Sequence, residues 1–158
     1  MRTDIGISEK SRGSVVSLLN NLLADEVVLY IKTRNFHWNV TGFHFHDLHK
    51  FFQTQYEALD EIVDETAERA RSLGGRPLGT MTEFLKAARL KEYPREFPDA
   101  KKMVRALLED HEEIIMFLRE DLAACADRYK DAGTSDFLTG LMERHEKLAW
   151  MLRSLLEP

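Results

Sequence analysis

The chain has 158 residues, of which 44% are hydrophobic and 31% are charged, a composition that predicts one globular domain over 1–158 and excludes a disordered or fibrous protein. The net charge of −5 disfavours a general phosphate-binding surface. Because residues 1–10 lack an apolar signal core and no run approaches ~18 consecutive apolar residues, we expect a cytoplasmic protein without membrane contact. The single cysteine, Cys125, excludes an internal disulfide and is expected to be a small buried core residue.

Apolar residues three and four positions apart predict long helices and no strand. The first helix is expected over about 11–36, after a short tail of residues 1–10, and it should end at the break over 39–42. The second should begin after Asp47, a plausible N-cap, and stop at Gly74-Gly75.

A different composition over 74–98, with three prolines, predicts a long crossover that holds one small helix, begun by the capping box from Thr80 to Glu83. The helical pattern resumes over 99–129, and a last helix capped by Thr134 or Ser135 runs to the end. Two short connections and one long one predict an all-α, ferritin-like four-helix bundle with a short extra helix in the crossover.

One stripe of the second helix carries polar side chains with metal-binding chemistry. Its members are His49, Gln53, Glu57, Asp60, Asp64 and Glu68. A solvated acidic face is the ordinary interpretation of such a stripe, but histidine at one end and acids four residues apart favour a shared cation. No Glu-x-x-His pair occurs in the chain, so we expect no intrasubunit site of the ferritin diiron type.

Helix geometry separates the histidines from the acids. At ~1.5 Å per residue, Asp64 and Glu68 lie roughly 22 to 28 Å along the helix from His49, so one chain cannot bring them to one metal. His37 should lie near His49 because the connection between the first two helices is short. If two chains pack these helices antiparallel about a two-fold axis, the histidines of one meet the acids of the other. Such a ligand set suits Fe(II), with Zn(II) or Mn(II) as competitors.

The pattern His37-Trp38, then His49, then Asp64-x-x-x-Glu68 resembles the Dps family, the DNA-binding proteins from starved cells, or mini-ferritins. The likeness extends over nearly the whole chain, through the segments FHWNVTG, AERARSLGG, LKEYP and TSDFLTG. The resemblance implies a hollow homo-dodecamer that oxidises Fe(II), preferentially with hydrogen peroxide, and stores ferric mineral. It also implies that His37, His49, Asp64 and Glu68 are the iron ligands of a ferroxidase site between subunits.

Several positions leave alternatives open. Many family members have an acid where this chain has Gln53, so a second iron would bind weakly or transiently, and the site is either mono-iron or di-iron. Asp60 is a candidate accessory ligand. Trp38 either intercepts oxidising equivalents, as the family position implies, or is a packing anchor. Asp131 and Asp136 either line an iron-entry pore or are solvated cap residues of the last helix.

The other histidines are expected to be structural or exposed. His44 and His46 fall in the connection between the first two helices, where exposed loop histidines are favoured over extra metal binding. His111 and His145 fall on the apolar faces of the last two long helices, at different heights from the connecting turn. We therefore expect separate core or interface histidines rather than a shared site.

The family name points to DNA, but residues 1–13 carry three cations and two acids, a side-chain balance of only +1. Few cationic contacts release few counterions, so we expect weak or absent DNA binding. The alternative function is a nucleoid-associated, DNA-binding stress-protection protein with secondary iron chemistry. A bundle whose histidines and acids are only structural is the third possibility.

Overall fold

A computed structural model describes residues 3–157. Within that range the secondary structure is entirely helical, which confirms the predicted all-α bundle with a short extra helix in the crossover. The elements are α1 (Glu9–Asn39), α2 (Phe45–Ser72), α3 (Met81–Ala87), α4 (Ala100–Ala123), the π-helical turn η1 (Ala124–Arg128) and α5 (Ala132–Ser154).

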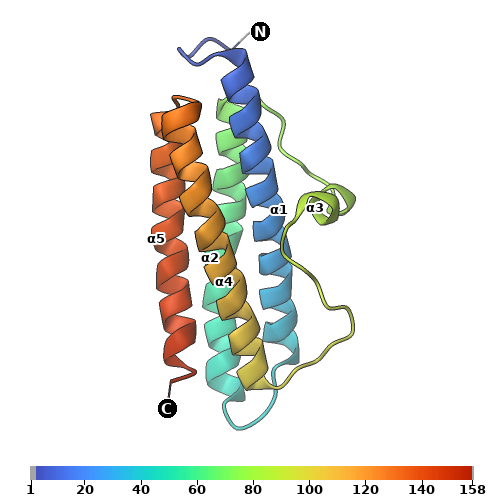
Figure 1. Cartoon of the computed structure of the whole chain (residues 1–158). Coiled ribbons are helices and arrows are strands. Elements are labelled where there is room, and N and C mark those ends of the chain that lie inside the picture. The colour runs from blue at the N-terminus through green and yellow to red at the C-terminus, as the bar shows by residue number, and fades with distance from the viewer. Residues whose placement is uncertain (1–2, 158) are drawn as a thin grey trace.

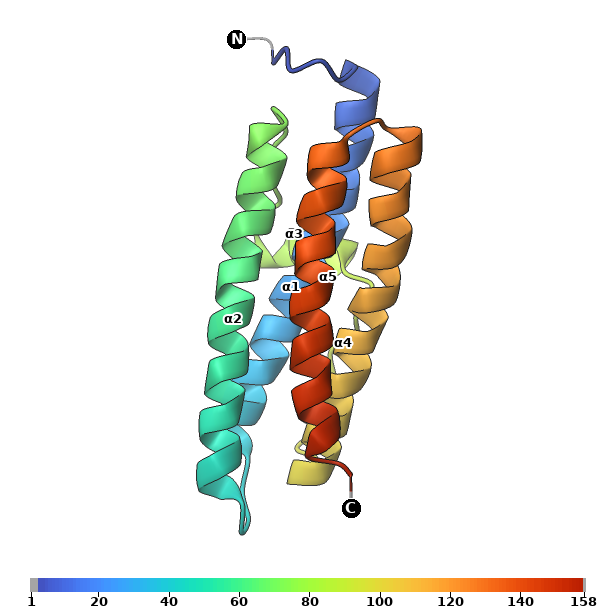
Figure 2. The ribbon, with the colours of Figure 1, turned by 90° about the vertical axis from the view of Figure 1, so that its left-hand side faces the viewer.

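The four long helices form two antiparallel pairs, α1 with α2 and α4 with α5 (Figure 1). The crossover leaves the end of α2, descends along the outside of α1 with α3 on its way, and enters α4 at the opposite end of the bundle. The view turned by 90° shows α2 and α4 running in the same direction (Figure 2). That parallel arrangement requires a connection as long as the bundle itself.

Helix α1 is the most enclosed element because α2, α4 and the crossover cover it. Every residue from Leu22 to Leu29 is buried, including Asp25 and Glu26. By length and composition alone α1 could cross a membrane, but 56% of its most apolar window is buried inside the structure. The core helix of a bundle meets the same criteria, since it too has few exposed charges.

Asp25 fastens the crossover to α1. Its carboxylate accepts hydrogen bonds from the backbone amides of Arg89 at 2.5 Å and Leu90 at 3.1 Å, and it pairs with the Arg89 guanidinium at 2.7 Å. The same guanidinium lies over the Phe117 ring of α4, 3.7 Å from its centroid. A buried carboxylate is thus fully hydrogen-bonded, as its low exposure requires.

Some helix ends differ from the sequence-based expectations. Helix α1 begins at Glu9, capped by Ser8, so the tail is shorter than 1–10, and its residues 1–2 lie outside the described range. Asp47 is not an N-cap, because the chain reverses at Gly42, with φ of +106°, and α2 already begins at Phe45. Asp47 therefore lies in the first turn, where a negative charge complements the helix dipole.

The last helix also starts earlier than expected. Its N-cap is Asp131 rather than Thr134 or Ser135, because the Asp131 carboxylate accepts from both the backbone amide and the hydroxyl of Thr134, at 2.9 and 2.6 Å. Arg69 of α2 donates to the same carboxylate at 3.3 Å. The predicted capping box at Thr80 and Glu83 is confirmed.

Candidate metal centre

His37 and His49 form a stacked pair where α1 ends and α2 begins. Their ring centroids lie 3.7 Å apart with an interplanar angle of 20°. The short connection over 40–44 brings the last turn of α1 against the start of α2, as the sequence predicted. His37 is buried and His49 is half-buried. The carboxyl end of α1 places its negative dipole here, which favours a cation.

Reciprocal hydrogen bonds fix the orientation of both rings. His37 Nδ1 donates to the His49 carbonyl oxygen at 2.7 Å, and His49 Nδ1 donates to the His37 carbonyl oxygen at 2.8 Å. A carbonyl oxygen only accepts, so each neutral imidazole carries its proton on Nδ1. Each Nε2 therefore keeps a lone pair, which is the form that binds a metal ion.

Aromatic side chains hold the histidine pair from both sides. The Phe45 ring stacks on His49 with centroids 5.1 Å apart, and the Tyr56 ring meets His37 edge-on at 5.2 Å. These contacts limit ring rotation, so the two Nε2 atoms are held in place before any metal arrives.

A permanent cation lies beside this aromatic group. The Arg34 guanidinium lies over the rings of Tyr30, Trp38 and Tyr56 at 5.5, 5.3 and 4.8 Å from their centroids. A hydrogen bond to the Tyr30 hydroxyl raises the pKa of Arg34 above its ordinary value. Trp38 remains 61% exposed, with its ring in contact with the Arg34 guanidinium.

The acids predicted to complete the site lie at the other end of the same helix. Asp64 and Glu68 are exposed on α2, which is continuous from Phe45 to Ser72, so the separation of roughly 22 to 28 Å from His49 stands. Within residues 3–157, no three histidine, cysteine or acidic side chains come close enough to hold a metal ion. The predicted ligands thus form two groups that lie too far apart to share a metal ion within one chain.

Gln53 and Asp60, which follow His49 on α2, interact with other side chains of the same chain. The Gln53 amide donates to the Glu57 carboxylate at 2.7 Å, so both turn toward each other along the helix. Asp60 is exposed and close enough to Arg34 to raise the pKa of that guanidinium. The structure places neither residue against His37 or His49 by a hydrogen bond.

The two acids at the start of α5 have different surroundings. Asp131 is 2% exposed, and its carboxylate accepts hydrogen bonds from Thr134 and Arg69. These contacts are those of a helix-capping residue. Asp136 is exposed, with its side chain free for solvent or a neighbouring molecule. Of the two acids, Asp136 is therefore the one exposed at the surface of the chain.

His111 and His145 are both fully buried, which confirms that they are core histidines, but the prediction that they lie apart was wrong. Their Nδ1 atoms are 2.9 Å apart in the core, and His145 Nε2 lies 2.9 Å from the buried Glu26 carboxylate. Counting residues from the turn overstated the offset, because η1 packs an extra residue into its turn and two imidazoles reach across the space between helices. Burial lowers the pKa of His111 well below its ordinary value, with His145 adding to the shift.

Other sequence-based expectations concern single residues. His44 and His46 are exposed, as expected for the connection between α1 and α2. Cys125 is fully buried, which confirms its expected place in the core. Burial is also the main reason why the pKa of its thiol is raised to about 12.

Sequence reasoning did not identify Phe45 and Tyr56 as supports of the histidine pair. Tyr56 follows His49 by seven residues, or two helical turns, and that spacing was a usable signal of a shared face. Phe45 gave no such signal, because its contact depends on where α2 begins.

The chain is similar to known proteins over most of its length. A family model for the ferritin-like domain matches residues 16–158. A low temperature-induced protein of Nostoc sp. is 47% identical over 156 residues, covering 99% of this chain and 87% of the relative. The DNA protection during starvation protein 2 of Bacillus anthracis is 38% identical, covering 90% of this chain and 96% of the relative. The crystal structure of a Dps protein from Vibrio cholerae, described as a ferritin-like diiron-carboxylate protein, is 33% identical with a TM-score of 0.92, covering 99% and 98%.

Proposed function

Because the chain belongs to the Dps family of ferritin-like proteins, we propose that it oxidises Fe(II), with hydrogen peroxide as the preferred oxidant, and stores the ferric product in a homo-oligomeric cage. The cage is a dodecamer of cytoplasmic subunits that protects against oxidative damage. The observation that carries the proposal is the His37–His49 pair, whose Nδ1 bonds leave both Nε2 atoms free to bind a metal ion.

The ligands come from two subunits. The Nε2 atoms of His37 and His49 from one chain face Asp64 and Glu68 of the partner subunit when the α2 helices pack antiparallel about a two-fold axis. Two imidazoles and two carboxylates form a set that Fe(II) accepts. The four side chains bind and orient the Fe(II) substrate, and the two carboxylates offset its charge.

The reaction balances only when two Fe(II) ions serve one peroxide. Each Fe(II) loses one electron, and hydrogen peroxide takes up two electrons and two protons to give two molecules of water. Gln53 supplies a neutral amide where a further carboxylate would hold the second ion, and this amide is already bonded to Glu57. The second Fe(II) therefore binds weakly, with Asp60 as its accessory ligand. Asp136, with Asp131 behind it, lines the route by which iron enters the cage.

The test compares Fe(II) oxidation in wild type and in a His37→Ala/Asp64→Ala variant. Fe(II) is added without oxygen, hydrogen peroxide follows, and ferric absorbance is recorded. We expect oxidation to slow at least tenfold in the variant, because each site loses a ligand from both subunits. The matched control, His44→Ala/Asp127→Ala, removes an exposed histidine and an exposed acid outside the site. Equal rates in wild type and the site variant, or no iron bound to the protein, would refute the function.

Two further measurements address assembly and DNA. Light scattering after size exclusion should give a mass near twelve chains, and a stable monomer would be incompatible with an interface site. DNA binding is proposed to be weak or absent, although several relatives are named for DNA protection. Retention of plasmid DNA in a gel at about 150 mM salt would favour the alternative, a nucleoid protein whose iron chemistry is secondary.

A further inference from the structure

Arg12 is a buried cation at the end of the bundle opposite to the histidine pair. The residue is only 8% exposed. Among the residues that the structure describes, its side chain makes one hydrogen bond, from Nη1 to the Leu73 carbonyl oxygen at 3.1 Å. Within residues 3–157, its Nε is buried without a hydrogen-bond partner and no carboxylate forms an ion pair with it. Buried charges are normally paired, so an unpaired buried guanidinium points to a missing anion.

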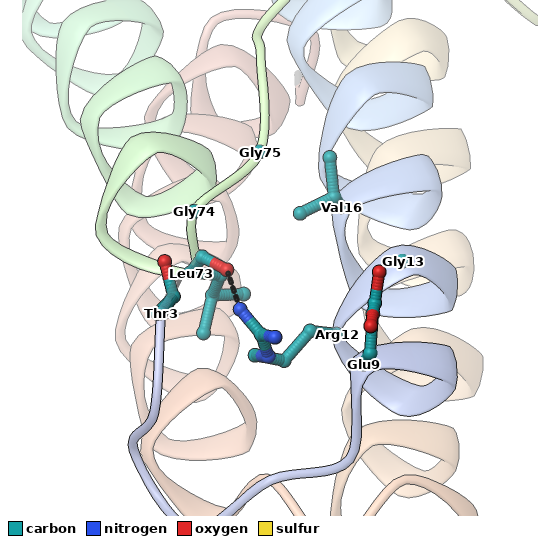
Figure 3. A pocket seen from close by; sticks show the side chains of 8 residues that line it. All are labelled: Thr3, Glu9, Arg12, Gly13, Val16, Leu73, Gly74 and Gly75. Atoms are coloured by element: carbon teal, nitrogen blue, oxygen red, sulfur yellow. Dashed lines mark hydrogen bonds between the residues drawn. The ribbon is translucent and has the colours of Figure 1, made fainter. Parts of the chain in front are cut away.

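The guanidinium borders a cavity of about 290 Å³, shown in Figure 3. That volume is close to the ~300 Å³ at which small-molecule pockets begin. The walls come from the start of α1, the end of α2 and the N-terminal segment, with lining residues Glu9, Arg12, Leu73, Gly74, Gly75 and Thr3. Three separate parts of the chain therefore enclose one cation.

The wall at the end of α2 depends on the absence of a side chain. Gly74 has a φ of +82°, and a Cβ atom there would collide with the Thr3 hydroxyl and lie 3.2 Å from Arg12 Nη1. Glycine thus lets the N-terminal segment and the guanidinium approach α2 closely. The Thr3 hydroxyl is a second polar group at the same wall.

We propose that this cavity binds a small oxyanion, with phosphate as the representative ligand, on the Arg12 guanidinium. A guanidinium edge presents two parallel N–H groups that match two oxygens of a phosphate or carboxylate. The amino end of α1 lies at the same cavity and adds positive potential.

Of the described residues that line the cavity, Glu9 is the one acid, and its negative charge repels an anion. In Figure 3 its side chain runs along α1 while the Arg12 side chain extends away to Leu73. Its carboxylate lowers the affinity for an oxyanion without neutralising Arg12. Removing the Glu9 charge should therefore raise the affinity for the oxyanion.

The experiment is calorimetric titration of phosphate into the iron-free full-length protein in chloride buffer at constant ionic strength. We expect saturable binding of one phosphate per chain, and at ten times the dissociation constant a rise in melting temperature of about 3–6 °C. Sulfate and acetate are titrated in competition. Displacement by sulfate alone identifies the site as one for tetrahedral anions, and equal displacement by acetate extends it to carboxylates.

Three variants make the test specific. Arg12→Lys, which keeps the charge but not the planar fork, should weaken phosphate binding about tenfold. Glu9→Gln should tighten it severalfold, because a repelling charge is removed. Arg76→Gln, at an exposed arginine close to the same wall, should leave the affinity unchanged.

Absence of saturable binding in wild type would overturn the proposal. So would an equal loss in the Arg12 and Arg76 variants, which would indicate binding to the general surface. A Glu9→Gln protein that is less stable without phosphate and binds it no more tightly would show that Glu9 itself is the counter-ion of Arg12, and would also overturn it.

Discussion

Mixing two inactive variants should restore activity if the iron site lies between subunits. The first variant, His37→Ala/His49→Ala, keeps its acids, and the second, Asp64→Ala/Glu68→Ala, keeps its histidines. Neither variant can build a site from its own copies, because every such site lacks either both histidines or both acids, and Asp64 and Glu68 lie roughly 22 to 28 Å along α2 from His49 of the same chain. When the two variants pair across a two-fold axis, one of the two sites at that interface has every ligand and the other has none.

The size of the recovery follows from symmetry. In cages assembled from an equal mixture, about half of the two-fold interfaces pair one variant with the other, and each holds one complete site out of two. The initial rate of Fe(II) oxidation should therefore be about a quarter of the wild-type rate, against almost none for either variant alone. The assay uses chains with different tags, co-expressed and purified through both tags in sequence. Mixed cages of verified composition that remain inactive would refute an interface site.

Three further predictions concern the bundle itself. Asp25→Ala should lower the melting temperature by roughly 6–20 °C, the equivalent of about 3–5 kcal/mol, because the half-buried Arg89 loses the buried carboxylate that accepts from its guanidinium and backbone amide; a change within 2 °C would contradict this. Because the pKa of His111 is lowered in the folded chain, the unfolded chain takes up a proton more readily below about pH 6.5. The free energy of unfolding should therefore decrease as the pH is lowered below about 6.5. In a His111→Leu variant that pH dependence should flatten, and an unchanged slope would show that His111 is not its source. Cys125, with its pKa raised to about 12, should resist iodoacetamide at pH 8 until the chain is unfolded, and rapid labelling of the folded protein would be the contrary result.

The sequence was informative wherever one periodic pattern decides the outcome. The four long helices, the crossover and the closeness of His37 to His49 all follow from apolar spacing and connection lengths. Helix ends were predicted less well. Asp47 and Thr134 are acceptable caps by residue type, but in the structure the N-cap positions are occupied by His44 and Asp131.

Contacts between distant parts of the chain were the other limit. The approach of His145 to Glu26 depends on the relative rotation of α5 and α1, and periodicity within one helix says nothing about that rotation. The same holds for Arg12, which looked like one of several tail cations and is instead buried against the end of α2. Tertiary packing, rather than residue type, decides the role of such side chains.

In the proposed assembly, helix α2 would set how far apart two neighbouring iron sites lie. Each antiparallel pair of subunits would hold two sites, and each copy of α2 reaches from one to the other, so the two centres are separated by roughly the same 22 to 28 Å. A single peroxide molecule cannot touch irons at that distance. In the proposed reaction the two-electron reduction of one peroxide would therefore take place within one site, and turnover would depend on how often a second Fe(II) occupies the weakly binding position beside Gln53.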